Sequence, residues 1–114
     1  MTSPAKAKGD RAERAVVEVL RAAGIPADRA YGAGRRPDHG DIDGLPGRYI
    51  QVRYRKEIRA AAWWQEACAV ALRLRMDPVL VIGIMGLPAG TWIVWHTSCR
   101  MRLEDWAKMV AAEP

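Results

Sequence analysis

The run 79-VLVIGIM-85 constrains the fold of this chain more than any other segment. It has no polar residue at alternate positions, and β-branched residues dominate it. A strand of this kind is buried on both faces, which happens in sheets that helices cover on both sides. The run is also far shorter than the roughly 20 residues that a membrane-spanning helix needs. It therefore predicts a central strand of a covered sheet.

Three segments show the apolar periodicity of helices. The first is expected from Gly9 or Asp10 to Ala23, with Asp10 as its cap and Glu13 in its first turn. Gly24 and Pro26 end this helix. The other two are expected over residues 58–76 and about 101–112. The buried face of the first helix is Ala12, Val16, Val19, Leu20 and Ala23.

Further strands are expected before and after the central one. A short strand is predicted over residues 29–31, and another over 91-TWIVWH-96. Between them, 41-DIDGL-45 and 48-RYIQVRY-54 flank a Pro-Gly turn, which favours a hairpin. The predicted order is α-β-β-β-α-β-β-α. This order indicates an α/β fold with a central mixed β-sheet flanked by helices.

Length and charge narrow the class of protein. A chain of 114 residues predicts one domain, here residues 9–114 after a flexible basic tail over residues 1–8. The net charge of +5 suits a polyanionic partner, nucleic acid before an acidic membrane. Cys68 and Cys99 belong to no zinc pattern and are expected to be reduced thiols. The N-terminus has no apolar leader, so a cytoplasmic protein without membrane contact is expected.

One group of polar residues has the composition of a metal-dependent hydrolytic site. Such a site needs oxygen ligands for Mg²⁺ and a cation near the scissile phosphate. Asp41 opens the acidic run, and Gln51 and Arg53 share one strand face because they are two residues apart. Glu13 can reach the same point from the first helix. We expect Asp41, Gln51 and Glu13 to hold Mg²⁺, or Mn²⁺, with Arg53 at the phosphate.

Each of these residues also has an ordinary structural explanation. Asp41 suits a turn, and Glu13 suits a solvated helix start. Gln51 and Arg53 suit the wet face of an edge strand, and His39 an ordinary loop position. Their joint occurrence in this order favours the site over the separate explanations.

The segments 11-RAERAVVEVLRAAG-24, 37-PDHGDIDGL-45, 49-YIQVRYRK-56 and 63-WWQEA-67 resemble the PD-(D/E)XK nuclease superfamily. Within it they are most similar to the archaeal and phage-type Holliday junction resolvases. The resemblance implies a restriction-endonuclease-like fold with an α-β-β-β-α-β core. It also implies that Glu13 is the helix carboxylate and Asp41 the principal metal ligand.

The resemblance places Gln51 and Arg53 where that superfamily usually has Glu and Lys. Gln51 keeps an oxygen ligand but removes a negative charge, so metal affinity should fall. Arg53 stays protonated, whereas lysine can lower its pKa and activate a water molecule. These two residues leave open a weakened or inactive nuclease fold that still binds branched or duplex DNA.

DNA contacts are expected from basic and polar residues around the site. Phosphate contacts position DNA without reading bases, which suits recognition of branched DNA by its shape. The expected contact residues are Arg35, Arg36, His39, Arg55, Lys56 and Gln65, the last implied by the resemblance.

The sequence thus predicts a Mg²⁺-dependent endodeoxyribonuclease, a Holliday junction resolvase acting in DNA recombination and repair. Two symmetric cuts need paired sites, so a homodimer is expected. The five tryptophans offer more aromatic surface than so small a core buries easily. They also leave open a regulatory protein that binds another protein through this surface.

Overall fold

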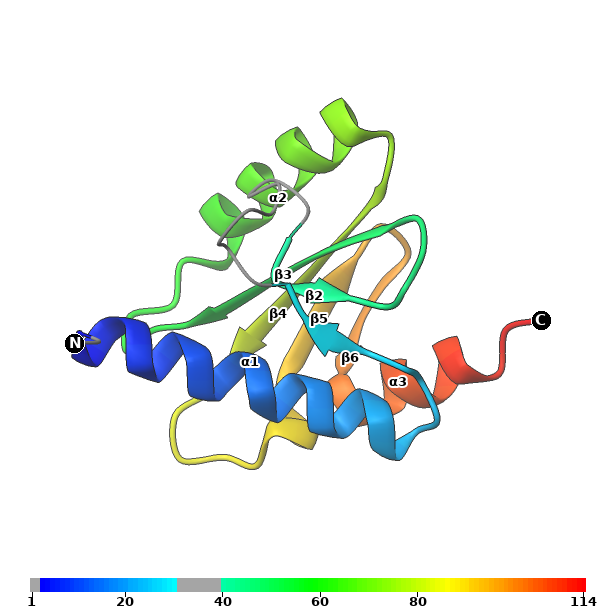
Figure 1. The fold of residues 1–114 in the computed structure, drawn as a ribbon. Coiled ribbons are helices and arrows are strands. Elements are labelled where there is room, and N and C mark those ends of the chain that lie inside the picture. The colour runs from blue at the N-terminus through cyan, green and yellow to red at the C-terminus, as the bar shows by residue number, and fades with distance from the viewer. Residues whose placement is uncertain (1–2, 31–39) are drawn as a thin grey trace.

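A computed structural model of the protein describes residues 3–30 and 40–114. Figure 1 shows a sheet with α1 and α3 on one side and α2 on the other. This arrangement confirms the predicted α/β class with helices on both faces of a mixed sheet. The elements are α1 (Pro4–Ala22), β1 (Asp28–Arg29), β2 (Ile42–Asp43), β3 (Arg48–Tyr54), α2 (Ala60–Leu74), β4 (Asp77–Gly83), the 3₁₀ turn η2 (Ala89–Thr91), β5 (Ile93–His96), β6 (Cys99–Arg102) and α3 (Leu103–Ala111).

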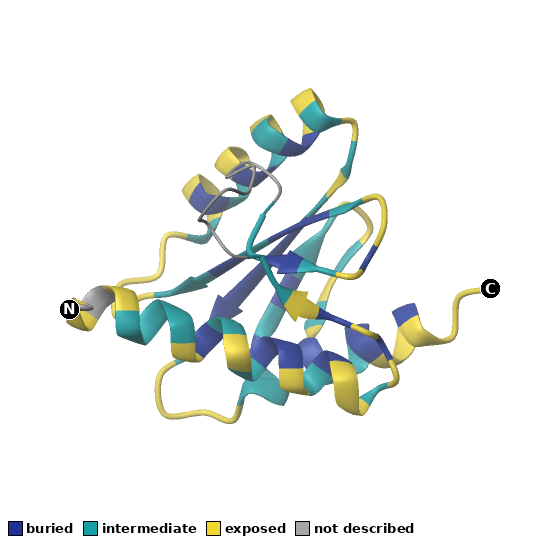
Figure 2. Cartoon of the chain, in the orientation of Figure 1, coloured by how far each residue is buried: buried dark blue, intermediate teal, exposed yellow. Residues whose placement is uncertain are grey.

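The main sheet has the strand order β3-β4-β5-β6. β3 pairs parallel with β4, and the other two pairs are antiparallel. β4 carries the apolar run that the sequence singled out, and Val79 to Gly83 are buried throughout (Figure 2). Val79 and Val81 face α1 and α3, whereas Leu80 and Ile82 face α2. The prediction of a central strand buried on both faces is therefore confirmed.

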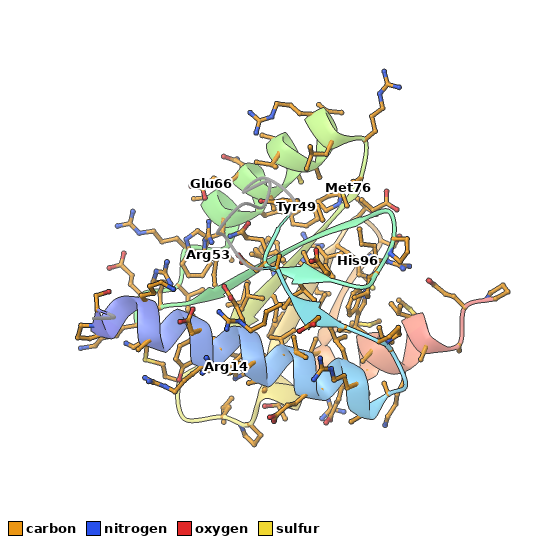
Figure 3. All side chains as sticks on the ribbon, viewed as in Figure 1. Arg14, Tyr49, Arg53, Glu66, Met76 and His96 are labelled. Atoms are coloured by element: carbon orange, nitrogen blue, oxygen red, sulfur yellow. The ribbon has the colours of Figure 1, made fainter. Side chains whose placement is uncertain are left out.

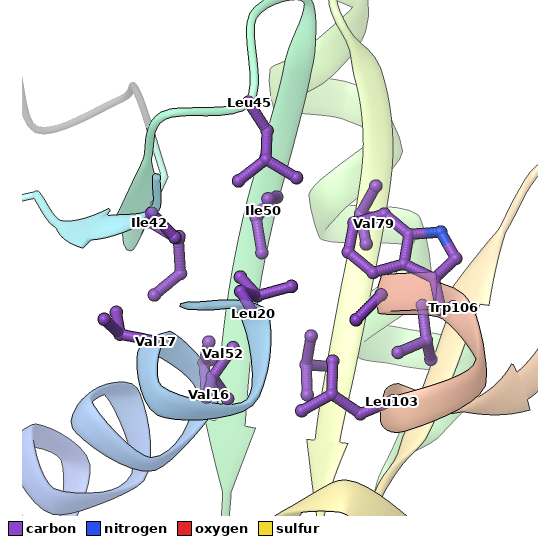
Figure 4. Close-up of a cluster of buried hydrophobic side chains, with 14 of the residues drawn as sticks. Val16, Val17, Leu20, Ile42, Leu45, Ile50, Val52, Val79, Leu103 and Trp106 are labelled. Carbon is purple, nitrogen blue, oxygen red and sulfur yellow. The ribbon is translucent and has the colours of Figure 1, made fainter. Parts of the chain in front are cut away.

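The larger part of the core lies between the sheet and the pair α1 and α3 (Figure 4). Trp106 and Leu103 of α3 meet Leu20 of α1 there, and all three are almost fully buried. Trp63 and Trp92 are buried within the same chain, so this small core holds more aromatic surface than expected. Among the described residues no helix is long and apolar enough to cross a bilayer.

The start of the first helix differs from the prediction. α1 begins at Pro4, so residues 4–8 are helical and the expected flexible tail is wrong for them. Ser3 is the cap: the Lys6 N–H donates to its Oγ at 3.1 Å, and proline is favoured at the first helical position. Gly9 lies inside the helix at a cost of about 1 kcal/mol relative to alanine.

Two strand predictions also differ. β2 does not pair with β3 as a hairpin; it pairs antiparallel with β1, aligning Arg29 with Ile42. β6 was not predicted, because Cys99–Arg102 alternates charged with weakly apolar residues. It pairs with β5 through the two-residue turn Thr97–Ser98. The second helix and the last helix begin two residues later than expected and end one or two residues earlier.

Substitutions of two leucines test the packing of the core. Leu20 is fully buried, whereas Leu72 on α2 is 80% exposed. Leu20→Ala should lower the free energy of unfolding by about 3–5 kcal/mol because it opens a cavity. Leu72→Ala, the matched control, should change it by less than about 0.5 kcal/mol. Urea denaturation measures both, and equal effects of the two substitutions would contradict this core.

Candidate functional site

Asp41 lies against the edge of β3 that is not paired with β4. Its N–H donates to the Ile50 carbonyl at 2.7 Å. The Val52 N–H donates to Asp41 Oδ2 at 2.8 Å, so the carboxylate occupies the position of a neighbouring strand's carbonyl. Gly40, at φ +90°, permits this approach, because a Cβ there would lie 2.7 Å from the Ile50 oxygen. Backbone geometry therefore fixes Oδ2, while Oδ1 has no hydrogen-bond partner among the described residues.

Glu13 reaches the same region from α1 and is held by Arg29 of β1. Arg29 donates to Glu13 Oε1 from Nε at 3.2 Å and from Nη2 at 3.1 Å. The same Nη2 donates to Asp10 Oδ1 at 2.8 Å. The Arg29 side chain is only 12% exposed, so these contacts are screened less than ordinary surface pairs. Glu13 is therefore fixed through one oxygen.

The charges of Asp41 and Glu13 act on each other. Burial raises the pKa of Glu13, and the negative charge of Asp41 raises it further, against the lowering effect of Arg29. Burial also raises the pKa of Asp41. The Val52 N–H and the positive charges of Arg53, Arg29 and Arg55 oppose that shift. Two partly desolvated carboxylates thus lie within electrostatic reach of three guanidinium groups.

Gln51 and Arg53 lie on the α2 face of β3, as the period of two predicts. Their neighbour Tyr49 packs on α2, whereas Ile50 and Val52 pack in the core beside α1. The Tyr49 hydroxyl donates to Gln51 Oε1 at 2.7 Å. Arg53 Nη2 lies 3.4 Å from Glu66 Oε2 of α2, and Figure 3 shows Tyr49, Arg53 and Glu66 on this side of the sheet.

Asp41, at the edge of β3, interacts with residues on both sides of the sheet. Glu13 comes from the α1 side and Gln51 from the α2 side, with Asp41 between the two layers. Asp41 interacts electrostatically with Glu13 and with Arg53. Among the described residues, Gln51 makes no hydrogen bond to either carboxylate. Its part in a shared metal site remains a prediction.

The predicted DNA-contact residues divide into two groups. Arg35, Arg36 and His39 fall outside the described residues. Arg55, Lys56 and Gln65 are all exposed. β3 ends at Tyr54, so Lys56 lies beyond the strand and its side is not set by strand alternation.

Metal ligands were also sought directly. Within residues 3–30 and 40–114, no three His, Cys, Asp or Glu side chains are grouped so as to hold a metal ion. Glu13 interacts electrostatically with two other carboxylates, Asp41 and Asp10, and Asp10 shares Arg29 with it. Magnesium is commonly held by one or two protein carboxylates together with waters and substrate phosphates. The pair of Asp41 and Glu13 is compatible with that form of binding.

Sequence reasoning did not foresee that Arg29 holds Glu13 or that Tyr49 binds Gln51. Arg29 approaches Glu13 only because β1 pairs with β2, a contact between distant segments that no local pattern announces. Tyr49 had a visible signal, since residues 49 and 51 share a strand face and its hydroxyl can reach the Gln51 amide.

The raised pKa of Asp41 makes a prediction for stability. A carboxylate whose folded-state pKa lies above the ordinary 3.8 binds its proton more tightly when folded, so its ionisation destabilises the protein as pH rises through the folded pKa. Asp41→Asn keeps an oxygen for the Val52 N–H and removes the charge. At pH 7 it should be at least as stable as the wild type, and this difference should shrink on acidification below the folded pKa.

Asp41→Ala is the matched comparison. It leaves the Val52 N–H without its partner, which should cost about 1–3 kcal/mol. Urea denaturation of both variants at several pH values measures the effects. An asparagine variant as unstable as the alanine variant at pH 7 would contradict the assigned balance of charge and hydrogen bond.

Comparison with known proteins shows a likeness of fold to a solved structure. No protein-family model matches the chain, and no curated protein sequence matches it. A solved structure of Hjc from Archaeoglobus fulgidus, a Holliday junction resolvase from an archaeal hyperthermophile, aligns with a TM-score of 0.55 at 20% sequence identity. The alignment covers 90% of this chain and 99% of that one. This chain therefore shares its fold with an archaeal Holliday junction resolvase.

Proposed function

We propose that this protein is a metal-dependent DNA endonuclease that acts on branched DNA, with the four-way junction as its first candidate substrate. The observation that carries the proposal is the pair Asp41 and Glu13, two partly buried carboxylates that interact electrostatically with each other and with Arg29. The positive charges of Arg53 and Arg55 act on Asp41. The archaeal protein of the same fold is a Holliday junction resolvase, which supports this substrate class. The chain's positive net charge suits a DNA partner. We place this cleavage in DNA recombination and repair in the cytoplasm.

Asp41 and Glu13 are suited to hold Mg²⁺, with Mn²⁺ as an alternative. Each has one oxygen fixed by a protein donor and a second oxygen without a partner among the described residues. A cation between them would offset the repulsion that raises the pKa of Glu13. Gln51 would join as a third ligand through its amide oxygen, which has two lone pairs and gives one to Tyr49.

The protein's own residues have separate roles in this proposal. A bound Mg²⁺ would supply a Lewis acid and activate the attacking water. Arg53 would bind the phosphate. Its present partner, the Glu66 carboxylate at 3.4 Å, is 63% exposed, so a phosphate can readily take the place of that carboxylate. Arg29 would keep Glu13 in place, because it already donates two hydrogen bonds to one oxygen.

Binding of DNA without cleavage is the second candidate. Two observations favour it: the Gln51 oxygen is already engaged by Tyr49, and Arg53 stands where a lysine would be able to lose its proton. The same guanidinium groups would then hold phosphates without assisting a cut. A protein with this second function would bind junctions in a salt-sensitive manner and release no metal-dependent product.

A two-fold dimer is part of the proposal for cleavage. Resolving a junction takes two symmetric cuts, which paired sites on a dimer supply. Trp64 and Trp95 are the tryptophans that remain partly exposed on one chain, on the α2 side of the sheet. They are candidates for contact between the copies.

Asp41→Asn tests the proposed metal ligand, since it removes the charge and keeps the backbone contact. Cleavage of a synthetic four-way junction in Mg²⁺ should fall by roughly 100-fold or more. Asp105→Asn, in the first turn of α3 with its side chain 46% exposed, is the matched control and should cleave like the wild type. The assay compares junction and linear duplex with and without metal. Wild-type cleavage by the Asp41 variant would overturn this site.

Arg53→Lys, alone and with Gln51→Glu, separates the two candidate functions. If the present site is complete, the wild type cleaves well and neither change raises the rate. If the chain is a binder, the wild type binds the junction without cutting, and the double variant gains cleavage because it restores a charge and an amine. Cleavage rate and junction affinity are measured on the same preparations. A wild type with neither salt-sensitive binding nor cleavage would exclude both functions.

A further inference from the structure

His96 and Cys99 form a pair of reactive groups away from the candidate nuclease site. The Thr97–Ser98 turn makes them opposite partners in the β5–β6 hairpin. Opposite residues point to the same face of a sheet, with Cβ atoms about 4.5–5.5 Å apart. Cys99 Sγ lies 2.8 Å from His96 Nε2. The hairpin register thus places a thiol against an imidazole.

The pair opens into a cavity of about 320 Å³ beside α3. The start of β4, the β5–β6 hairpin and the outer part of α3 form its walls. Both side chains are only partly buried, and their exposed part lets a small molecule reach the sulfur from the cavity. Glu13, Asp41, Gln51 and Arg53 do not line this cavity. Its chemistry is therefore separate from that of the nuclease site.

The charges around the pair favour a neutral imidazole. Burial lowers the pKa of His96, and the positive charges of Arg48 and Arg100 lower it further, so the ring is neutral at pH 7 and able to accept a proton. Arg100 Nη1 donates to the His96 carbonyl at 3.3 Å and lies 3.5 Å from the Cys99 carbonyl. Arg48 is paired with Glu113 at 2.6 Å. Asp77 also lines the cavity, and its carboxylate carries the opposite charge to Arg48 and Arg100.

We propose that Cys99 is a reactive thiol, with His96 as its base, which hydroperoxides oxidise to a sulfenic acid. The thiol proton passes to His96 Nε2, and the thiolate attacks the terminal peroxide oxygen. The S–O bond forms as the O–O bond breaks. The departing oxyanion takes the proton from the imidazolium and leaves as water or an alcohol. Sulfur is oxidised by two electrons and the peroxide is reduced by two.

Cys68 is an internal reference in the same chain. It is also a free, partly buried cysteine, on α2. Burial raises the pKa of its thiol, although Arg100 acts in the opposite direction. Arg100 is therefore close to both cysteines, and the imidazole contact distinguishes Cys99. Because burial also acts on the Cys68 thiol, the effect of His96 itself is isolated by replacing His96 and following both cysteines.

The test treats the protein with hydrogen peroxide and traps sulfenic acid with a 1,3-dione. Mass spectrometry then measures the rate at each cysteine. Cys99 should react roughly tenfold or more faster than Cys68, since the thiolate is the reacting form. His96→Gln should slow Cys99 by a similar factor and leave Cys68 unchanged. Cys68→Ser should keep the fast reaction, and Cys99→Ser should lose it.

Equal rates at the two cysteines of the wild type would overturn the proposal, as would an unchanged Cys99 rate in His96→Gln. If the His96→Gln variant unfolded, Cys68 would also react faster. The proposal would then be judged from the ratio of the Cys99 and Cys68 rates in the wild type. Circular dichroism detects such unfolding. The measurement uses no DNA, so its outcome is independent of the proposed nuclease activity.

Discussion

The hydrogen bond from the Val52 N–H to the Asp41 carboxylate determines which group occupies the unpaired edge of β3. A backbone carbonyl at that position would extend the sheet by one more strand. A carboxylate there ends the pairing and brings a charge to the edge instead. Gly40 makes this possible by allowing the backbone to approach the strand more closely than a side chain permits. β2 then pairs with β1, which brings Arg29 toward Glu13.

The resulting site has an electrostatic cost. Asp41 and Glu13 are partly desolvated and repel each other, and Arg29 offsets this only in part, because the pKa of Glu13 stays raised. Arrangements that cost stability are common where a protein binds a cation or a phosphate. The raised pKa of Glu13 is the feature that the proposed cation site would use.

Local signals carried most of the fold and only part of the site. The apolar run of β4 and the alternation along β3 predicted a covered sheet and the shared face of Gln51 and Arg53. The β1–β2 pairing and the Arg29 contact depend on segments far apart in sequence, and residue patterns do not encode such pairings directly. The cap of α1 was misplaced because Asp10 and Ser3 are both good caps, and Pro4 was read as a tail residue.

The geometry of β3 also limits how DNA can approach. Its residues point alternately toward α1 and toward α2, so Glu13 and Arg53 belong to opposite layers. Asp41 acts on both because it lies at the edge of β3, against the backbone of Ile50 and Val52. A phosphate that used Arg53 and a cation held by Glu13 would have to meet at that edge rather than on either face of the sheet.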